Sequence, residues 1–190
     1  MNCLPDIAEI RMGYSFRGRL ESNFAGDVSV IQMKDIDEAN TLRPESLTQV
    51  FMPDLADRHC VQKGDLLFRS RGGSYGAALV VIELVRTVLA APMLLVRPVH
   101  AQVNPAYLQW VLNHPDTLAK LVALEAGTSV KMISKAALEQ LEIPLPSLQE
   151  QSRIVAIAQL AAHEATLLEQ LRLRRNALAA GVLMSYALKG

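Results

Sequence analysis

The chain has 190 residues, of which 51% are hydrophobic and 5% aromatic, and its 19 basic and 19 acidic side chains give a formal net charge of zero. This length holds one globular domain with an appendage, and the apolar fraction excludes wholesale disorder. Residues 1–150 carry 14 Lys and Arg against 17 Asp and Glu (14 − 17 = −3), and residues 151–190 carry 5 against 2 (5 − 2 = +3). Nucleic-acid-binding domains are usually basic, so this chain could bind DNA only through positive charge gathered on one face.

The pattern of cysteines, histidines and apolar runs gives no sign of a metal site, a cofactor or a membrane segment. Cys3 and Cys60 are too few and too far apart for a disulfide framework or a zinc site, and the four histidines are scattered. No basic residue precedes Arg11, unlike in a signal peptide, and the apolar stretch 77–96 is interrupted by two charges and a proline. We therefore expect a cytoplasmic protein with reduced thiols.

Six short stretches have the composition of β-strands. They are rich in Val, Ile and Leu and are bounded by Gly, Pro or polar residues. The segment 34–47 is polar and predicted to be irregular, and 50–58 is ambiguous. The predicted strands are Ile7–Met12, Val28–Met33, Leu66–Arg69, Ala77–Leu84, Val88–Ala90 and Met93–Arg97.

The glycine-rich stretch Arg69–Gly76 (RSRGGSYG) is the strongest candidate for contact with DNA. Glycines let backbone amides approach a phosphate closely, and Arg69 and Arg71 can reach a phosphate or a guanine edge. A nucleotide-binding loop would share this composition, but the GxxxxGK[ST] pattern is absent. A hairpin turn with solvated arginines is the remaining alternative.

Two helices are predicted to follow the strands. Asn104 can cap the first, with Pro105 at its first helical position, and His114 and the proline after it end that helix. The second helix is predicted over Asp116–Glu125 and ends before Gly127.

Residues 127–157 carry three boundary signals in succession. Ser134 can cap a short helix, and the extended residues 141–143 are ended by the PLP sequence that follows them. Ser147 and Glu150 then have the spacing of a capping box, which starts a new helix. That helix runs without proline almost to the C-terminus, and roughly 40 residues at 1.5 Å each make it about 60 Å long.

Within this stretch, ALEQLEIPLPSLQEQSRIVAI resembles the segment of type I restriction-modification specificity subunits that leaves a DNA target-recognition domain and enters the spacer helix. The family pattern is an apolar pair, I-P-x-P, an apolar residue, E-Q and I-V. The order of strand, GDLLF-x-S-x-G loop and strand also resembles the family, as does the opening strand followed by Gly13. The matching residues of the spacer segment are Leu138, Leu141, Ile143, Pro144, Pro146, Leu148, Glu150, Gln151, Ile154 and Val155.

The resemblance implies a mixed α/β (α+β) fold, with a β-rich target-recognition domain over residues 1–146 and a long coiled-coil-like helix over 147–190. It implies a non-catalytic specificity subunit that binds double-stranded DNA and directs a partner adenine methyltransferase (modification) subunit, with a restriction subunit as a further candidate partner. Full subunits of the family carry two recognition domains and two spacer helices. This chain is therefore expected to be a half-subunit that dimerises, or a fragment of a longer chain.

The resemblance also implies which loops face the DNA. One follows the opening strand, one is the glycine-rich loop, and one follows Gly127. The candidate DNA-binding residues are Arg17, Arg19, Arg69, Arg71, Gly72, Ser74, Tyr75, Thr128, Ser129 and Lys131.

The long helix carries an apolar seam that predicts an antiparallel homodimer. With Ile154 as position a of a heptad, seven of the ten a and d positions are apolar. Glu164 and Arg175 interrupt the seam on either side of a midpoint near 169–170, so an antiparallel pairing places each opposite the other. The predicted dimerisation residues are Ile157, Ala161, Glu164, Leu168, Leu171, Arg175, Leu178 and Val182.

Two other classes of protein remain open from the sequence. The chain could be the recognition half of a split or truncated DNA methyltransferase, or a protein that assembles through its helix without binding DNA. No nucleophile elbow, metal-ligand pair or nuclease-like cluster is present, so we predict no catalytic residue and no metal.

Overall fold

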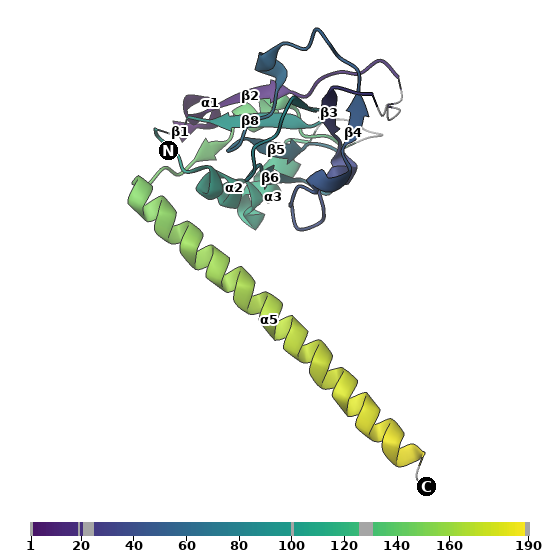
Figure 1. Ribbon diagram of the computed structural model, residues 1–190. Helices are drawn as coiled ribbons and strands as arrows, with labels where there is room; N and C mark the ends of the chain where they lie inside the picture. The colour runs from purple at the N-terminus through teal and green to yellow at the C-terminus, as the bar shows by residue number, and fades with distance from the viewer. Residues whose placement is uncertain (1, 19, 21–24, 100, 126–130, 189–190) are drawn as a thin grey trace. The chain divides into compact units, whose positions relative to one another are not determined.

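The computed structural model describes residues 2–18, 20, 25–99, 101–125 and 131–188. The chain divides into two compact units, Met1–Gln151 and Ser152–Gly190. The first unit combines small β-sheets with short helices, and the second is helical (Figure 1). The predicted class, a mixed α+β domain followed by one long C-terminal helix, is confirmed.

A four-stranded antiparallel sheet forms the centre of the first unit, in the order β2-β8-β5-β6. All four side chains of β5 are buried, as expected of a short apolar strand that is covered on both faces. The strands are β2 (Ala8–Met12), β5 (Leu66–Arg69), β6 (Gly76–Leu79) and β8 (Leu94–Pro98).

A three-stranded sheet and a two-stranded ladder complete the β-structure. In the order β4-β3-β7, β3 pairs antiparallel with β4 and parallel with β7, and β1 pairs antiparallel with β9. The two-stranded ladder thus ties the start of the chain to the segment that leaves the domain. The strands are β1 (Asn2–Cys3), β3 (Val28–Ile31), β4 (Thr48–Val50), β7 (Thr87–Leu89) and β9 (Glu142–Ile143).

Two of the apolar clusters in the core receive side chains from the three-stranded sheet. Successive side chains of a strand point to opposite faces, so Val28 and Val30 join one cluster while Ile31 joins the other. The larger cluster contains Ile31, Ile36, Val61, Leu67, Ala78, Val80, Leu89, Met93 and Leu95, and the smaller contains Val28, Val30, Leu55, Val88 and Ala90.

A buried ion pair joins β8 to the turn that precedes β5. Arg97 donates from Nε and Nη2 to the two carboxylate oxygens of Asp65, both at 2.7 Å. The Asp65 side chain is 2% exposed, and its Oδ2 also accepts from the backbone N–H of Gln62 at 2.7 Å. The carboxylate therefore fixes the turn at the same time as it neutralises the arginine.

The predicted strands over Val28–Met33 and Ala77–Leu84 are shorter in the structure. The first ends at Ile31 because Gln32 starts a 3₁₀ turn, where its N–H donates to the Asp35 carboxylate at 2.8 Å. The second leaves the sheet after Leu79, the partner of the first residue of β5.

Short helices cover parts of the sheets, and capping residues start them as the sequence predicts. Asn104 Oδ1 accepts from Ala106 N at 2.9 Å, and Ser134 Oγ accepts from Ala137 N at 3.0 Å. The helix expected to reach residue 125 ends at residue 123. The helices are α1 (Leu4–Ile7), η1 (Met33–Asp35), η2 (Pro44–Ser46), η3 (Asp57–His59), α2 (Pro105–Asn113), α3 (Pro115–Ala123) and α4 (Lys135–Glu139).

Helix α5 (Leu148–Ala187) begins inside the first unit. The predicted capping box is present, because Ser147 N donates to Glu150 Oε2 at 3.2 Å and Glu150 N donates to Ser147 Oγ at 3.3 Å. Gln151 is fully buried; its Oε1 accepts from Asn104 N at 2.8 Å and its Nε2 donates to Pro146 O at 2.9 Å. These bonds anchor the first turn of α5 in the domain.

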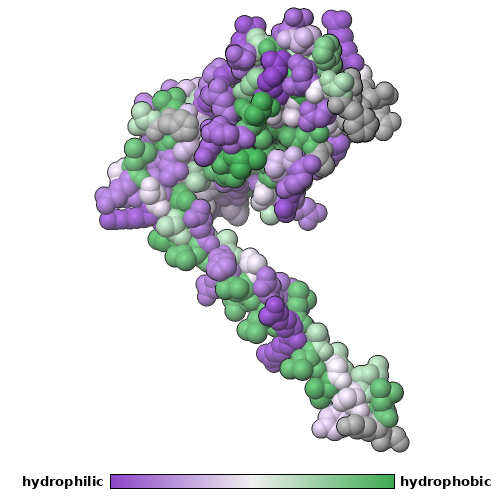
Figure 2. Space-filling model, in the orientation of Figure 1, coloured by the Kyte–Doolittle hydropathy of each residue, from purple (hydrophilic) through white to green (hydrophobic). Residues whose placement is uncertain are grey.

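Every described side chain from Gln159 to Leu188 is exposed. Hydrophobic side chains appear along the length of α5 in Figure 2. Leu168 and Leu178 of this helix are 60% and 70% exposed. No helix within the described residues is long and apolar enough to cross a membrane. An amphipathic helix in water normally buries such residues against another element.

Candidate nucleic-acid interface

The glycine-rich segment 70–75 joins β5 to β6 as a loop with an exposed tip. The ladder below it ends at the pair Arg69–Gly76. Gly72 and Gly73 have φ angles of 88° and 77°, a region that side-chain-bearing residues rarely adopt, so glycine lets the chain turn here at low cost. The exposed tip consists of Arg71, Gly72, Gly73 and Ser74.

The first end of this loop is bonded to two other segments. Ser70 Oγ donates to Pro92 O at 2.7 Å, and Ser70 O accepts from Ile133 N at 2.8 Å. Arg71 also forms an isolated antiparallel bridge with Met132. The glycine-rich loop therefore lies beside residues 131–133, which belong to the segment after Gly127 that the family resemblance assigned to DNA.

Arg69 differs from the sequence-based expectation that it would lie with Arg71 in a cleft facing DNA. It is only 7% exposed, and its Nη2 donates to Asn40 Oδ1 at 2.7 Å. Its Nε is buried and has no hydrogen-bond partner among the described residues. Arg69 is the last residue of β5, and its buried side chain helps to hold the loop in place. Arg71, in contrast, is exposed.

Tyr75, at the other end of the loop, is also buried, with 8% of its surface exposed. Burial, followed by the nearby Glu125 carboxylate, raises the pKa of Tyr75 to about 12. The same carboxylate lies 3.7 Å from Lys131 Nζ, and the Lys131 side chain is 72% exposed. Lys131 can therefore reach an anion in solvent, whereas Tyr75 is held in the domain.

The loop after β2 reaches the same region by a separate route. Gly13 packs against the Ala90 backbone so closely that a Cβ would lie 2.6 Å from the Ala90 carbonyl carbon. Tyr14 N then donates to Leu89 O at 2.6 Å, and Ala91 N donates to Tyr14 O at 2.9 Å. Arg17 follows as an exposed residue.

A pocket of about 440 Å³ lies between this loop and two residues that contact the glycine-rich loop, Met33 and Pro92. It is lined by Ser15, Phe16, Gly18, Leu20, Gln32, Met33, Ala90, Ala91 and Pro92. Pro92 accepts the Ser70 bond, and Met33 Cε would lie 3.7 Å from a Cβ on Gly72. Three loops distant in sequence thus meet through shared neighbours.

Of the predicted residues, the structure places Arg71 and Gly72 beside Met132, the neighbour of Lys131, and shows Ser74 and Arg17 as exposed residues of their own loops. Arg19, Thr128 and Ser129 lie outside the described residues. Lys34, which the sequence did not single out, is exposed, follows Met33 in η1 and donates from Nζ to Thr48 Oγ1 at 3.4 Å. The Gln-x-x-Asp spacing around it is a local capping signal that could have shown the segment to be ordered.

This arrangement is suited to binding an anion. Arg17, Lys34, Arg71 and Lys131 are exposed cations, and within the described part of the chain no ion pair engages Arg17 or Arg71. The same described part contains no group of three or more His, Cys, Asp or Glu side chains that could hold a metal ion. Exposed arginines and closely approachable glycine amides are the groups that contact phosphates and base edges.

Comparison with protein families matches residues 1–173 to the type I restriction modification DNA specificity domain. Comparison with curated proteins finds no match.

Solved structures show the same fold at low sequence identity. The HsdS subunit from Thermoanaerobacter tengcongensis is 21% identical over 77% of this chain and 38% of that one, with a TM-score of 0.64. A structure from work on complex assembly and conformational transition of the type I R-M system is 21% identical over 92% of this chain and 41% of the other, with a TM-score of 0.67. The S subunit from M. genitalium is 12% identical over 84% and 37%, with a TM-score of 0.52. The chain thus spans less than half the length of each of these proteins.

Proposed function

The chain belongs to the family of type I restriction modification DNA specificity domains, and we propose that it recognises a specific base sequence in double-stranded DNA. The observation that carries this proposal is the Arg71–Met132 bridge, which joins the exposed Arg71 to the segment that contains Lys131. The loop after β2 lies on a pocket whose lining residues Met33 and Pro92 also contact the glycine-rich loop. The chain supplies recognition and no catalysis. A partner DNA methyltransferase (modification) subunit carries out methyl transfer, and a restriction subunit is the further partner of the same complex.

Within this interface, we assign different roles to the exposed and the buried residues. The domain carries a net negative charge, so attraction to DNA requires the exposed cations to lie together, as Arg71 and Lys131 do. Arg69 and Tyr75 are buried, and we assign them the role of holding the two ends of the glycine-rich loop. The residues assigned to DNA contact are Arg17, Arg19, Lys34, Arg71, Gly72, Ser74, Thr128, Ser129 and Lys131.

Helix α5 assembles two copies of the chain in this proposal. Exposed apolar residues of the predicted seam include Ile157 at 68%, Leu171 at 63% and Val182 at 46%. Other exposed leucines, such as Leu160 at 69%, widen the apolar surface beyond a narrow seam. A helix of 40 residues with this surface is stabilised by packing against a second helix.

An antiparallel register for this homodimer is supported by Glu164 and Arg175. Both are exposed, and neither is engaged in an ion pair within the described residues. In an antiparallel pair centred near residues 169–170, each glutamate meets the arginine of the other copy, whereas a parallel pair would place like charges together. The two recognition domains then lie at opposite ends of the helix pair and read two inverted half-sites.

The experiment that tests this function is selection from a library of duplexes with a randomised central segment, using the full chain at about 100 mM salt. Salt at this level suppresses binding that depends on phosphate attraction alone. The proposal predicts enrichment of two short inverted half-sites separated by a fixed spacer. Enrichment of a single half-site would overturn the homodimer but retain DNA recognition, and no enrichment would overturn the recognition function.

A further inference from the structure

Two asparagine side chains from distant parts of the chain hold the base of the glycine-rich loop. The base is the pair Arg69–Gly76, which is the last rung of the β5–β6 ladder. Asn40 comes from the turn between η1 and η2, and Asn113 is the last residue of α2. Both side chains are half-buried.

Asn113 bonds to β6 as a neighbouring strand would. Its Oδ1 accepts from Ala77 N at 2.8 Å, and its Nδ2 donates to Ala77 O at 2.9 Å. Gln109, one helical turn earlier, also donates to Ala77 O, at 3.3 Å. Because β6 is an edge strand of its sheet, these amides satisfy backbone groups that would otherwise lack a partner.

Asn40 contacts both strands of the base. Its Oδ1 accepts from Arg69 Nη2 at 2.7 Å, and its Nδ2 lies 3.5 Å from Asn113 Oδ1. A Cβ on Gly76 would collide with the Asn40 amide, so glycine at that position permits the approach. Asn40 itself has a φ of 57°, in the left-handed region that asparagine tolerates better than most residues.

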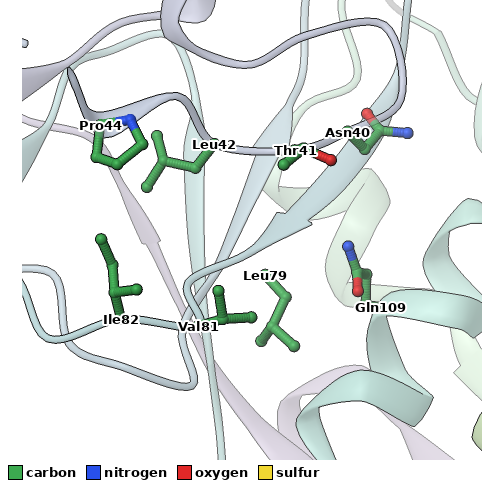
Figure 3. Close-up of a pocket in the computed structure, with 8 residues that line it drawn as sticks. All are labelled: Asn40, Thr41, Leu42, Pro44, Leu79, Val81, Ile82 and Gln109. Carbon is green, nitrogen blue, oxygen red and sulfur yellow. The ribbon is translucent and has the colours of Figure 1, made fainter. Parts of the chain in front are cut away.

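The partner that Asn40 offers to Arg69 is neutral. Buried arginines are usually paired with a carboxylate, but the only hydrogen bond of the Arg69 guanidinium within the described residues is to the Asn40 amide. Among the described residues, no carboxylate forms an ion pair with Arg69. Asn40 and Gln109 also line one end of a pocket of about 310 Å³, opposite Pro44 and Ile82 in Figure 3.

We propose that Asn40 and Asn113 are positioning residues for sequence recognition, because together they fix the Arg69–Gly76 base from which Arg71 and Ser74 are presented. The proposal rests on the function proposed above. Neither asparagine needs to touch DNA: both act through the loop. Loosening the base should impair the reading of bases more than the attraction to phosphates, because base contacts require exact placement and phosphate attraction does not.

The test compares two substitutions of Asn40 in the full chain. Asn40→Gly keeps the left-handed backbone but removes the amide, whereas Asn40→Asp keeps an acceptor for Arg69 and adds a negative charge. Each variant is titrated against the enriched duplex and a scrambled duplex of the same composition, and the ratio of the two affinities is measured. The matched control is Gln49→Ala. It removes another hydrogen bond made by a side-chain amide, from Gln49 Nε2 to Ser29 Oγ at 2.9 Å in the three-stranded sheet.

We expect Asn40→Gly to lower the affinity ratio at least about tenfold, the effect of losing a hydrogen bond to a charged group. Asn40→Asp should weaken binding to both duplexes and leave their ratio within about threefold, and Gln49→Ala should leave it unchanged. The proposal would be overturned if Asn40→Gly left the affinity ratio unchanged, or if Asn40→Asp lowered the ratio as much as Asn40→Gly does. If Asn40→Gly does not fold, Asn113→Asp takes its place, and we expect the same fall in the affinity ratio. A wild-type chain that binds both duplexes equally would instead overturn the function itself.

Discussion

Replacing Asp65 with alanine should destabilise the recognition domain more than a typical substitution does. The change removes two Arg97 hydrogen bonds and one from the Gln62 backbone, each 2.7 Å long, and leaves an arginine side chain that is only 19% exposed without its counter-charge. Breaking a buried ion pair by removing one partner costs about 3–5 kcal/mol. Asp65→Asn should cost less, because the amide keeps one acceptor.

Urea unfolding followed by Trp110 fluorescence measures this effect in the first unit, where the chain's one tryptophan lies on α2. With a slope of roughly 1–3 kcal/mol per molar urea, the Asp65→Ala midpoint should fall by at least about 1 M. The matched control is Glu139→Gln, which breaks the exposed Lys135–Glu139 pair and should cost at most about 0.5 kcal/mol. A loss for Asp65→Ala no larger than that of the control would refute the reasoning.

Three further predictions concern the interface and the helix. The free energy of unfolding of the wild type should fall as the pH rises from 10 towards 12. Burial raises the pKa of Tyr75 to about 12, so the charged phenolate is disfavoured in the folded state. Tyr75→Phe should lose less stability over that pH range, as measured by urea titrations. Gly13→Ala should lower DNA affinity, measured by fluorescence anisotropy, because its Cβ would force the Ala90 backbone to shift. Glu164→Arg should weaken the homodimer in light scattering at micromolar concentration, and adding Arg175→Glu should restore it; a double variant no better than the single one would contradict the antiparallel register.

The parts of the fold that follow from local rules were predictable from the sequence. The caps at Asn104 and Ser134 and the Ser147–Glu150 box need only neighbouring residues, and each has the predicted hydrogen bonds. The strand over Leu66–Arg69 was predicted with the observed bounds, because a short run of buried apolar residues after a glycine turn has few alternatives.

The candidate site was predictable only as far as its loops. The glycines of 72–73 marked the turn, but the orientation of Arg69 depends on Asn40, which is 29 residues away in the chain. Likewise, Asn113 bonds to Ala77 across 36 residues, and no local pattern reports that contact. Residues that support a loop from distant segments carry no periodicity or motif, so sequence reasoning assigned the exposed tip and missed its support.

The central claim is that the proposed DNA interface reads base sequence through Arg71. It is tested most directly by comparing Arg71→Ala with Lys63→Ala. Both residues are exposed cations, but Lys63 precedes β5 and Arg71 follows it, so they lie at opposite ends of that strand. Affinities for the enriched and the scrambled duplex are measured at matched salt. The account predicts that Arg71→Ala weakens binding to the enriched duplex by about 1–3 kcal/mol and lowers its preference over the scrambled one, whereas Lys63→Ala retains that preference. Equal effects of the two substitutions, or an unchanged preference in Arg71→Ala, would contradict it.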